Sequence, residues 1–405
     1  MSRVWRIFWK VLLLVLIAAA VLGVIYRKKI HEYYAVYQYA QTFKPDVIDQ
    51  NFRSLYKIYP SIRVPHEGEV SPLPYREQPL PETYVYQGET RRVADWLDKT
   101  QTTGFIVLKD GVVLHEQYER GNTAATQSIA MSMSKSTISF LIGNAVRDGL
   151  IRLDETVDRY APELSEGGYK GVTVKNVLQM SSGIGFNENY GDLSSDIVHY
   201  IIQILTGSVK DFTAHLQNVR PQGMQNVYVS ADTQVLAMVL EGATGKPFVQ
   251  YFREKLWSRL GAEADASWLA DARGDAVAAG GLNAVLRDYA RFGLLYMNEG
   301  RNFKGEQLVP TQWVHDSVTP DAPYLMPGRD DPQAGKPLGY GYQWWVPGKP
   351  QGDFVAVGIY GQFIYVNPQR KVVIAKTSAY ADYNKTGQQM KDESIIALQA
   401  IADTL

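Results

Sequence analysis

The chain has 405 residues, of which 45% are hydrophobic and 20% are charged, and its formal net charge is −1. This composition is ordinary for a globular protein and lacks the basic excess that nucleic-acid binding needs. The sequence contains no cysteine, which excludes disulfides, thiolate catalysis and cysteine metal sites. Because the length exceeds what one small core needs, we expect one large domain with extensions, or two subdomains.

The first notable feature is a long apolar run near the N-terminus. Residues 11–26 contain no polar side chain except the hydroxyl group of Tyr26, and basic residues flank the run on both sides. A membrane span needs ~20 apolar residues. We therefore predict an uncleaved transmembrane anchor over residues 1–29, because the run continues beyond the small residues at 18–20. A cleaved signal peptide and a buried core helix are the alternatives, and the flanking charges do not decide the orientation.

Two segments separate this run from the first clear folded element. Residues 30–59 are rich in tyrosine, which can anchor a chain at a membrane interface or pack against a domain. Six prolines follow between positions 60 and 81 and favour an extended arm. We therefore expect a juxtamembrane segment and proline-rich arm over residues 30–90, and a compact domain over residues 91–405.

Hairpin signals mark both ends of that domain. Near its start, strand-like residues 105–108 and 112–118 flank Lys109-Asp110-Gly111, and near its end residues 363–366 and 372–376 flank a polar turn. Residues 390–405 have a helical pattern. Strands at both ends with helical material between them predict an α+β fold, in which an antiparallel sheet is flanked by helices and carries an inserted helical subdomain.

The most informative motif is Ser132 followed three residues later by Lys135. Apolar spacings of three and four over residues 134–148 predict a helix, and residues three apart share one helix face. Serine is a weak nucleophile until a nearby base takes its proton. A lysine held out of water can lose its own proton near neutral pH and act as that base. Taken alone, the motif also fits an exposed helix start with a solvated lysine.

Further motifs follow along the chain. They are a polar loop ending at Tyr190, the tripeptide Tyr228-Val229-Ser230, a glycine-rich segment ending at Asn283, and a strand start with Gly358, Ile359 and Tyr360. Each also has a structural explanation when it is taken singly. A tyrosine can pack in the core or in a loop, asparagine can serve a turn, and glycine can serve strand geometry.

In this order the motifs resemble those of the serine β-lactamase and penicillin-binding-protein superfamily. Within it the chain is similar to the class C-like esterase branch, and there to the nylon-oligomer (aminohexanoate-dimer) hydrolases. The resemblance covers residues 91–405 and implies a β-lactamase-like version of the predicted fold. It rests on five blocks: Ser-Met-Ser-Lys-Ser, Leu-Gln-Met-Ser-Ser-Gly, Asn-Glu-Asn-Tyr, Leu-Arg-Asp-Tyr-Ala-Arg-Phe-Gly and Gly-Gln-Phe-Ile-Tyr-Val-Asn-Pro.

The resemblance implies catalytic roles for four residues. Ser132 would be the acylated nucleophile, Lys135 its activating partner, and Tyr228 the group that passes a proton to the leaving group. The backbone N–H groups of Ser132 and Ile359 would form the oxyanion hole. The substrate contacts implied by the resemblance and by the motif positions come from Tyr190, Ser230, Asn283, Gly358 and Tyr360.

The sequence departs from the family pattern at two places. Ser230 stands where the family's Tyr-x-Asn motif has asparagine, and a hydroxyl group offers fewer simultaneous hydrogen bonds than an amide. Ala356-Val357-Gly358 stands where the family has Lys-Thr-Gly. The cation and hydroxyl group that grip the carboxylate of a β-lactam are therefore missing from this strand, and we do not expect efficient penicillin hydrolysis.

We predict a serine hydrolase that cleaves small esters, or linear or D-amino amides, through an acyl-enzyme on Ser132. One alternative is a peptidoglycan-directed D-peptidase of the same fold. Another, from a different class, is a catalytically idle binding or sensor protein tethered to the membrane. The natural substrate, the preference for ester or amide, and the oligomeric state are left open by the sequence.

The expected partners are a small ester or amide substrate and, through the N-terminal helix, a membrane. We predict no cofactor, no metal site and no nucleic-acid partner, since the histidines form no His-Glu-x-x-His pattern and there is no phosphate loop. The resemblance implies a single-pass protein of the bacterial inner membrane with its catalytic domain in the periplasm.

Overall fold

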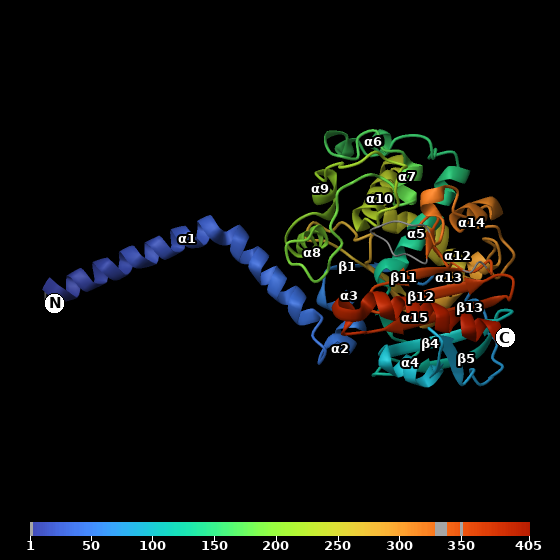
Figure 1. Ribbon diagram of the computed structural model, residues 1–405. Helices are drawn as coiled ribbons and strands as arrows, with labels where there is room; N and C mark the ends of the chain where they lie inside the picture. Colours follow the sequence, from blue (N-terminus) through green and yellow to red (C-terminus); the bar gives the residue numbers. More distant parts are fainter. Residues whose placement is uncertain (1–2, 329–337, 349–350) are drawn as a thin grey trace.

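A computed structural model describes residues 3–328, 338–348 and 351–405 (Figure 1). Its centre is a seven-stranded sheet in which all neighbouring strands are antiparallel. Across the sheet the strands are β5 (Val112–Tyr118), β4 (Thr102–Lys109), β13 (Val372–Ser378), β12 (Gln362–Asn367), β11 (Phe354–Gly358), β10 (Trp345–Val346) and β9 (Gly339–Tyr340). Because β4 pairs with β13, the two ends of the domain close the sheet, as the sequence predicts.

Both predicted hairpins are present. Asp110 and Gly111 join β4 to β5 with φ angles of 51° and 76°, the left-handed backbone that a tight two-residue hairpin turn requires. The second hairpin joins β12 to β13. The C-terminal helix α15 (Tyr383–Asp403) begins seven residues before the predicted start at residue 390.

Helices cover both faces of this sheet. Helix α13 (Leu286–Met297) packs on β12 and β13 from one side. On the other side α4 (Val93–Lys99) and α15 lie together, where Trp96 Nε1 donates a hydrogen bond of 3.1 Å to Ser394 Oγ. Alternate residues of each strand therefore face two different helical layers, which explains why β12 and β13 are buried along their whole length.

A helical subdomain is inserted between the strands, at the top of Figure 1. It starts with α5 (Ser134–Arg147), which agrees with the helix predicted over residues 134–148. The α-helices that follow are α6 (Val157–Tyr160), α7 (Val174–Leu178), α8 (Asp196–Thr206), α9 (Val209–Ala214), α10 (Ser230–Thr244), α11 (Phe248–Phe252) and α12 (Ser258–Leu260). The shorter α14 (Thr311–Ser317) comes later in the chain.

A second sheet has four strands in the order β1 (Ser61–Val64), β7 (Ala266–Leu269), β8 (Leu282–Val285) and β6 (Gln127–Ile129). Strand β1 comes from the proline-rich arm, pairs with β7 and buries Val64. The arm is therefore extended, as predicted, and this part of it belongs to a sheet of the folded body. A two-stranded ribbon of β2 (Thr83–Tyr86) and β3 (Glu89–Arg92) completes the arm.

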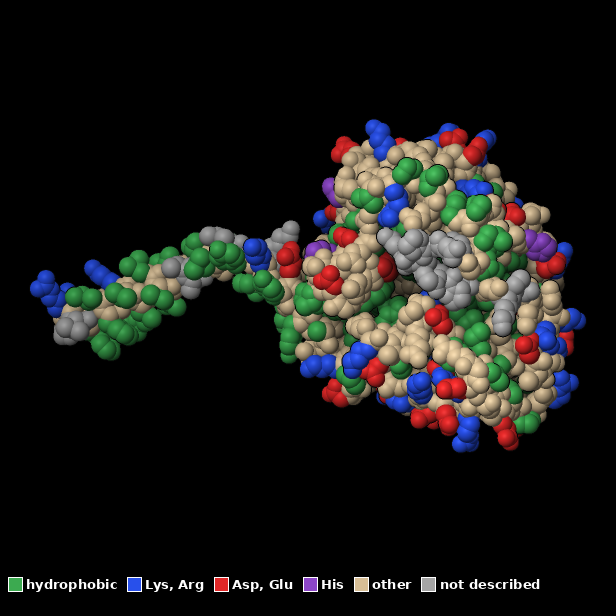
Figure 2. Space-filling view, in the orientation of Figure 1, with side chains coloured by type: hydrophobic (Ala, Val, Ile, Leu, Met, Phe, Trp, Pro, Cys, Tyr) green, Lys and Arg blue, Asp and Glu red, His purple; other side chains and the backbone are tan. Residues whose placement is uncertain are grey.

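Helix α1 (Arg3–Thr42) projects away from the body (Figure 1), and hydrophobic side chains cover its outer part (Figure 2). Its segment Trp5–Val24 has a mean hydropathy of 2.7 and is not buried in the protein. Among the described residues, this is the one helix long and apolar enough to cross a membrane. The other end of α1 docks on the body, where Ala35 is buried and α2 (Ile48–Phe52) and α3 (Leu55–Ile58) follow.

Candidate active site

Ser132 lies where the second sheet passes into the helical subdomain. Strand β6 ends at Ile129, and a short 3₁₀ turn, Met131–Met133, leads directly into α5. Met131, the residue before the serine, has a left-handed φ of 48°. Non-glycine residues in this conformation carry strain and cluster at functional sites. The turn places Ser132 at the start of α5, beside Lys135 one turn further on.

Lys135 is buried and its amino group has three oxygen neighbours. The Nζ atom lies 2.9 Å from Ser132 Oγ and 3.2 Å from Ser230 Oγ, and it donates to the carbonyl oxygen of Ala279. The side chain is 1% exposed, and burial lowers its pKa to about 8. A neutral amine has two N–H donors and one lone pair. With the donors directed to Ser230 and Ala279, the lone pair is free to accept the proton of Ser132.

Glu188, which was not among the predicted site residues, completes this cluster. Its carboxylate accepts hydrogen bonds from the Ser230 backbone N–H at 3.0 Å, from the Ser230 hydroxyl at 2.5 Å and from the Tyr190 hydroxyl at 2.9 Å. Burial raises the pKa of Glu188, while the charge of Lys135 opposes that rise. The only available signal was its position inside the Asn-Glu-Asn-Tyr block, because the contact with Ser230 spans 42 residues of chain.

Tyr228 borders the nucleophile on another side. Its ring lies 5.3 Å from Lys135 Nζ, and its hydroxyl group lies close to that of Ser132. The ring also stacks on Trp345, with centroids 5.4 Å apart. Burial raises the pKa of Tyr228 well above its ordinary value, so the phenol is protonated at neutral pH. Tyr228 can therefore donate a proton, and Lys135 is the better base of the two.

The end of β11 runs alongside the turn before Ser132. A Cβ atom at Gly358 would lie 2.4 Å from the carbonyl oxygen of Ala130, so only glycine permits this approach. Ile359 follows and borders the same space as Ser132. Tyr360 comes next with a left-handed φ of 62°, so a strained residue adjoins each of the two positions predicted to form the oxyanion hole.

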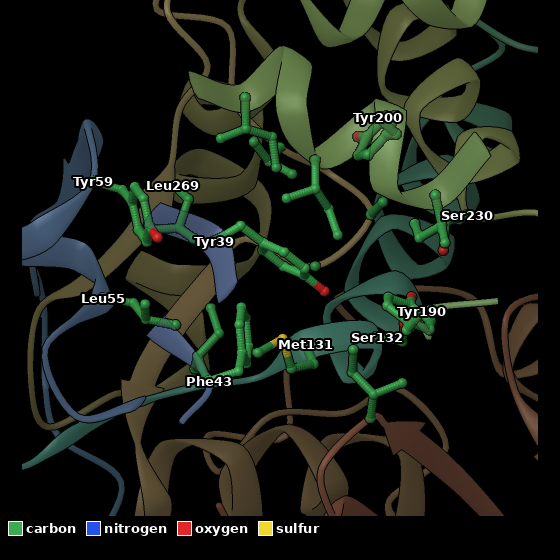
Figure 3. A pocket seen from close by; sticks show the side chains of 18 of the residues that line it. Tyr39, Phe43, Leu55, Tyr59, Met131, Ser132, Tyr190, Tyr200, Ser230 and Leu269 are labelled. Atoms are coloured by element: carbon green, nitrogen blue, oxygen red, sulfur yellow. The ribbon is translucent and has the colours of Figure 1, made fainter. Parts of the chain in front are cut away.

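Two cavities meet at Ser132, and Ile359 and Tyr190 also line both of them. The first, which we call the apolar cavity, is shown in Figure 3. It is lined by Tyr39, Phe43, Leu55, Tyr59, Ile129, Met131, Ser132, Tyr190, Ile197, Tyr200, Ile201, Ile204, Leu205, Ser230, Leu269, Val277, Ala279, Gly280 and Ile359.

The second, the polar cavity, lies on the side of Tyr228 and the C-terminal helix. It is lined by Ser132, Glu188, Asn189, Tyr190, Gly191, Tyr228, Trp345, Val357, Gly358, Ile359, Phe363, Tyr383, Asn384, Gln388, Met390 and Lys391. The lining thus includes a carboxylate, side-chain amides and an ammonium group, which belong to Glu188, to Asn189, Asn384 and Gln388, and to Lys391. The two cavities therefore differ in the chemistry that they offer to the two halves of a substrate.

Most of the residues selected from the sequence come together here. Lys135 lies behind Ser132 rather than in a cavity wall, and Asn283 and Tyr360 do not border the cavities either. Asn283 is fully buried on β8, where its Nδ2 donates to the carbonyl oxygen of Gly281 at 2.9 Å. Tyr360 packs beneath the site, stacked on Phe43 with ring centroids 5.1 Å apart. Neither is among the described residues that line the two cavities. Gly280, three residues before Asn283, and Ile359, directly before Tyr360, line the apolar cavity instead.

Comparison with known proteins places this geometry in a family. A family model described as β-lactamase matches residues 91–399. A 6-aminohexanoate-dimer hydrolase from Paenarthrobacter ureafaciens is 31% identical over 293 residues, which cover 71% of this chain and 74% of that protein.

Solved structures share the fold. A proposed 6-aminohexanoate-dimer hydrolase from Bacillus anthracis superimposes with a TM-score of 0.80 at 23% identity, covering 90% of this chain and 96% of that chain. A family VIII carboxylesterase superimposes with a TM-score of 0.54 at 17% identity, covering 71% and 89%. The chain belongs to the β-lactamase family, and it is a serine hydrolase of the kind that acts on esters or amides.

Proposed function

We propose that the protein is a membrane-anchored hydrolase that cleaves small esters, or linear or D-amino amides, through an acyl-enzyme on Ser132. The observation that carries this proposal is the distance of 2.9 Å between Lys135 Nζ and Ser132 Oγ, together with the burial of Lys135. A buried lysine beside a serine is an activated nucleophile with its base in place.

The first half of the reaction forms the acyl-enzyme. Neutral Lys135 takes the proton of Ser132 while Oγ attacks the carbonyl carbon of the substrate. The backbone N–H groups of Ser132 and Ile359 receive the negative charge on the carbonyl oxygen, an effect worth ~3 kcal/mol per donor. The strained turns beside both residues support this role, because they hold the two N–H groups in a fixed orientation.

The leaving group then needs a proton. Tyr228 supports this step, because its hydroxyl group is protonated and lies close to that of Ser132. It passes its proton to the departing alcohol or amine and regains one from protonated Lys135. In the second half of the reaction, water attacks the ester on Ser132 and Lys135 takes a proton from that water. Lys135 then returns the proton to Ser132 Oγ as the free acid leaves.

The proposed location rests on helix α1. Its apolar segment Trp5–Val24 supports a membrane anchor within residues 1–29, and the family resemblance supports a periplasmic catalytic domain at the bacterial inner membrane. Residues 30–90 would then connect the anchor to the hydrolase domain, residues 91–405, and add strand β1 to it.

One observation favours a second candidate, a D-peptidase that acts on peptidoglycan. Lys391 lines the polar cavity, with its Nζ 5.2 Å from the ring centroid of Trp345. Although Ala356 and Val357 remove the usual cation from β11, Lys391 of α15 offers another that could meet a carboxylate on the leaving group.

A panel of substrates tests the proposal. The full chain and its Ser132→Ala variant are assayed with p-nitrophenyl esters, aminohexanoate dimer, a D-Ala-D-Ala peptide and nitrocefin. We expect hydrolysis of simple esters by the wild type alone and poor turnover of nitrocefin. Cleavage of the peptide without cleavage of any ester would favour the D-peptidase. Equal activity of the Ser132→Ala variant would contradict the proposed mechanism.

A further inference from the structure

We propose that the apolar cavity binds the acyl chain of the substrate, and that the preferred substrates are esters or amides of an uncharged, medium-length fatty acid with a polar leaving group. This inference rests on the proposed function and adds the substrate class. It is drawn from the lining of the cavity, from the position of Tyr228, and from the part that α1 plays in the cavity wall.

The lining offers no partner to a charged group. Helix α8 contributes Ile201, Ile204 and Leu205, and no Asp, Glu, Lys or Arg is found among the described residues that line the cavity. The cavity has a volume of about 820 Å³ including its open mouth. Space of this kind favours a hydrocarbon chain, because burying an apolar surface is favourable and burying an unpaired charge is costly.

The hydroxyl groups around the cavity already have partners in the protein. The Tyr59 hydroxyl is hydrogen-bonded to Thr42 at 2.6 Å and that of Tyr200 to Gln234 at 2.9 Å, while the hydroxyl groups of Tyr39 and Tyr360 lie close together. The hydroxyl groups of Tyr190 and Ser230 bond to one carboxylate behind the site, as described above. What these residues present to a ligand is therefore mainly ring and hydrocarbon surface.

The position of Tyr228 decides which half of the substrate enters this cavity. A group that protonates the leaving atom must lie within hydrogen-bond reach of that atom. Tyr228 lines the polar cavity and is not among the described residues of the apolar cavity. The leaving group therefore occupies the polar cavity, with its amide and ammonium side chains, and the acyl group extends into the apolar cavity on the other side of Ser132.

The N-terminal segment forms one wall of the acyl site. Tyr39, near the end of α1, and Phe43, just after it, point into the cavity, with Leu55 and Tyr59 close by (Figure 3). Phe43 is held by stacking on Tyr360, with centroids 5.1 Å apart. The helix that carries the apolar segment Trp5–Val24 thus ends at the acyl site, which lets one chain both anchor the protein and shape its specificity.

The test is a chain-length series on the full chain in lipid nanodiscs. The substrates are p-nitrophenyl acetate, butyrate and octanoate, together with the 8-aminooctanoate ester, which places an ammonium group at the chain end. We expect kcat/KM to rise by up to about fourfold for each added methylene group. The ammonium-tipped ester should be at least tenfold poorer than octanoate. A flat or falling series, or an ammonium-tipped ester as good as octanoate, would overturn the inference.

Two variants on α8 make the test specific to the cavity. Ile204→Asp places a charge in the cavity wall, whereas His199→Asp places the same charge on the exposed side of that helix. The octanoate-to-acetate ratio of kcat/KM should fall at least tenfold in Ile204→Asp and stay unchanged in His199→Asp. Partition of the esters into lipid affects this ratio equally in both variants, so it does not alter the comparison. Equal ratios in both would overturn the acyl site. Failure to hydrolyse any ester, acetate included, would instead overturn the proposed function.

Discussion

The carboxylate of Glu188 accepts two hydrogen bonds from Ser230, one from its backbone N–H at 3.0 Å and one from its hydroxyl group at 2.5 Å. The proton of Ser230 is therefore directed at Glu188, and the oxygen of Ser230 is left to accept from Lys135 at 3.2 Å. At the position where the family resemblance implies an asparagine amide, this chain uses a serine and a carboxylate together. The pair also places a negative charge close to the catalytic lysine.

This arrangement predicts how Glu188→Gln alters the pH dependence. Burial lowers the pKa of Lys135 to about 8, while the charge of Glu188 raises it. Since Lys135 works as a base only when neutral, kcat/KM should rise as pH increases through this pKa. Removing the charge of Glu188 should lower the pKa and move that rise to lower pH.

The pH–rate profile of Glu188→Gln should be compared with those of the wild type and of Glu119→Gln, a change at an exposed carboxylate. An unchanged position of the acidic limb in Glu188→Gln would show that Glu188 carries no charge that Lys135 senses.

Changes at Lys135 should separate its role as a base from its role as a charge. Lys135→Ala should lower kcat/KM for an ester by about 10²- to 10⁴-fold, the usual contribution of a general base. Lys135→Arg should not restore activity, because arginine keeps its proton at any working pH. Steady-state kinetics on both variants check this, with circular dichroism as the control for folding. An active Lys135→Arg enzyme would mean that the lysine supplies only positive charge.

Tyr190→Phe should affect amides more than esters. An amine leaves poorly unless a polar group steers its nitrogen, whereas an alkoxide needs less help, and the family resemblance places the Tyr190 hydroxyl near the leaving nitrogen. The structure adds that this hydroxyl donates to Glu188 at 2.9 Å and lines both cavities. The measurement is kcat/KM for a matched ester and amide. Equal losses on both substrates would assign Tyr190 a packing role.

Two truncations should separate the proposed anchor from the catalytic body. Removal of residues 1–29 should give a soluble, active enzyme, because the docked end of α1 remains. Removal of residues 1–46 deletes Tyr39 and Phe43 and uncovers Tyr360, so it should lower both the melting temperature and ester turnover. Thermal unfolding and ester kinetics check both. Similar behaviour of the two fragments would show that the end of α1 contributes nothing to the site.

Local patterns predicted much of the fold. The turn at Asp110 and Gly111 fixed one hairpin, and the three-residue spacing of Ser132 and Lys135 correctly placed both side chains on one helix face. These predictions succeeded because each depends on residues close in the chain. The order of the family blocks indicated the β-lactamase family, which the family match confirms.

Contacts between segments that lie far apart in the chain could not be predicted from the sequence. Nothing in the chain near Ser230 indicates that Glu188 binds it, since a loop far away in sequence supplies the carboxylate. The apolar cavity likewise depends on a contact between α1 and α8. From the sequence alone, the tyrosines in residues 30–59 fit a membrane interface as well as they fit packing against the domain. Asn283 shows the reverse case, because a motif position alone does not say toward which side of a strand the residue points.

The most direct test of the central claim is covalent labelling of the full chain with a fluorophosphonate, followed by mass spectrometry of the digested protein. We expect a single label on the peptide that carries Ser132. The Ser132→Ala variant should keep its fold, take up no label, and lose about four to six orders of magnitude in ester turnover. A label on another residue, or a Ser132→Ala protein that hydrolyses esters at near wild-type rate, would contradict it.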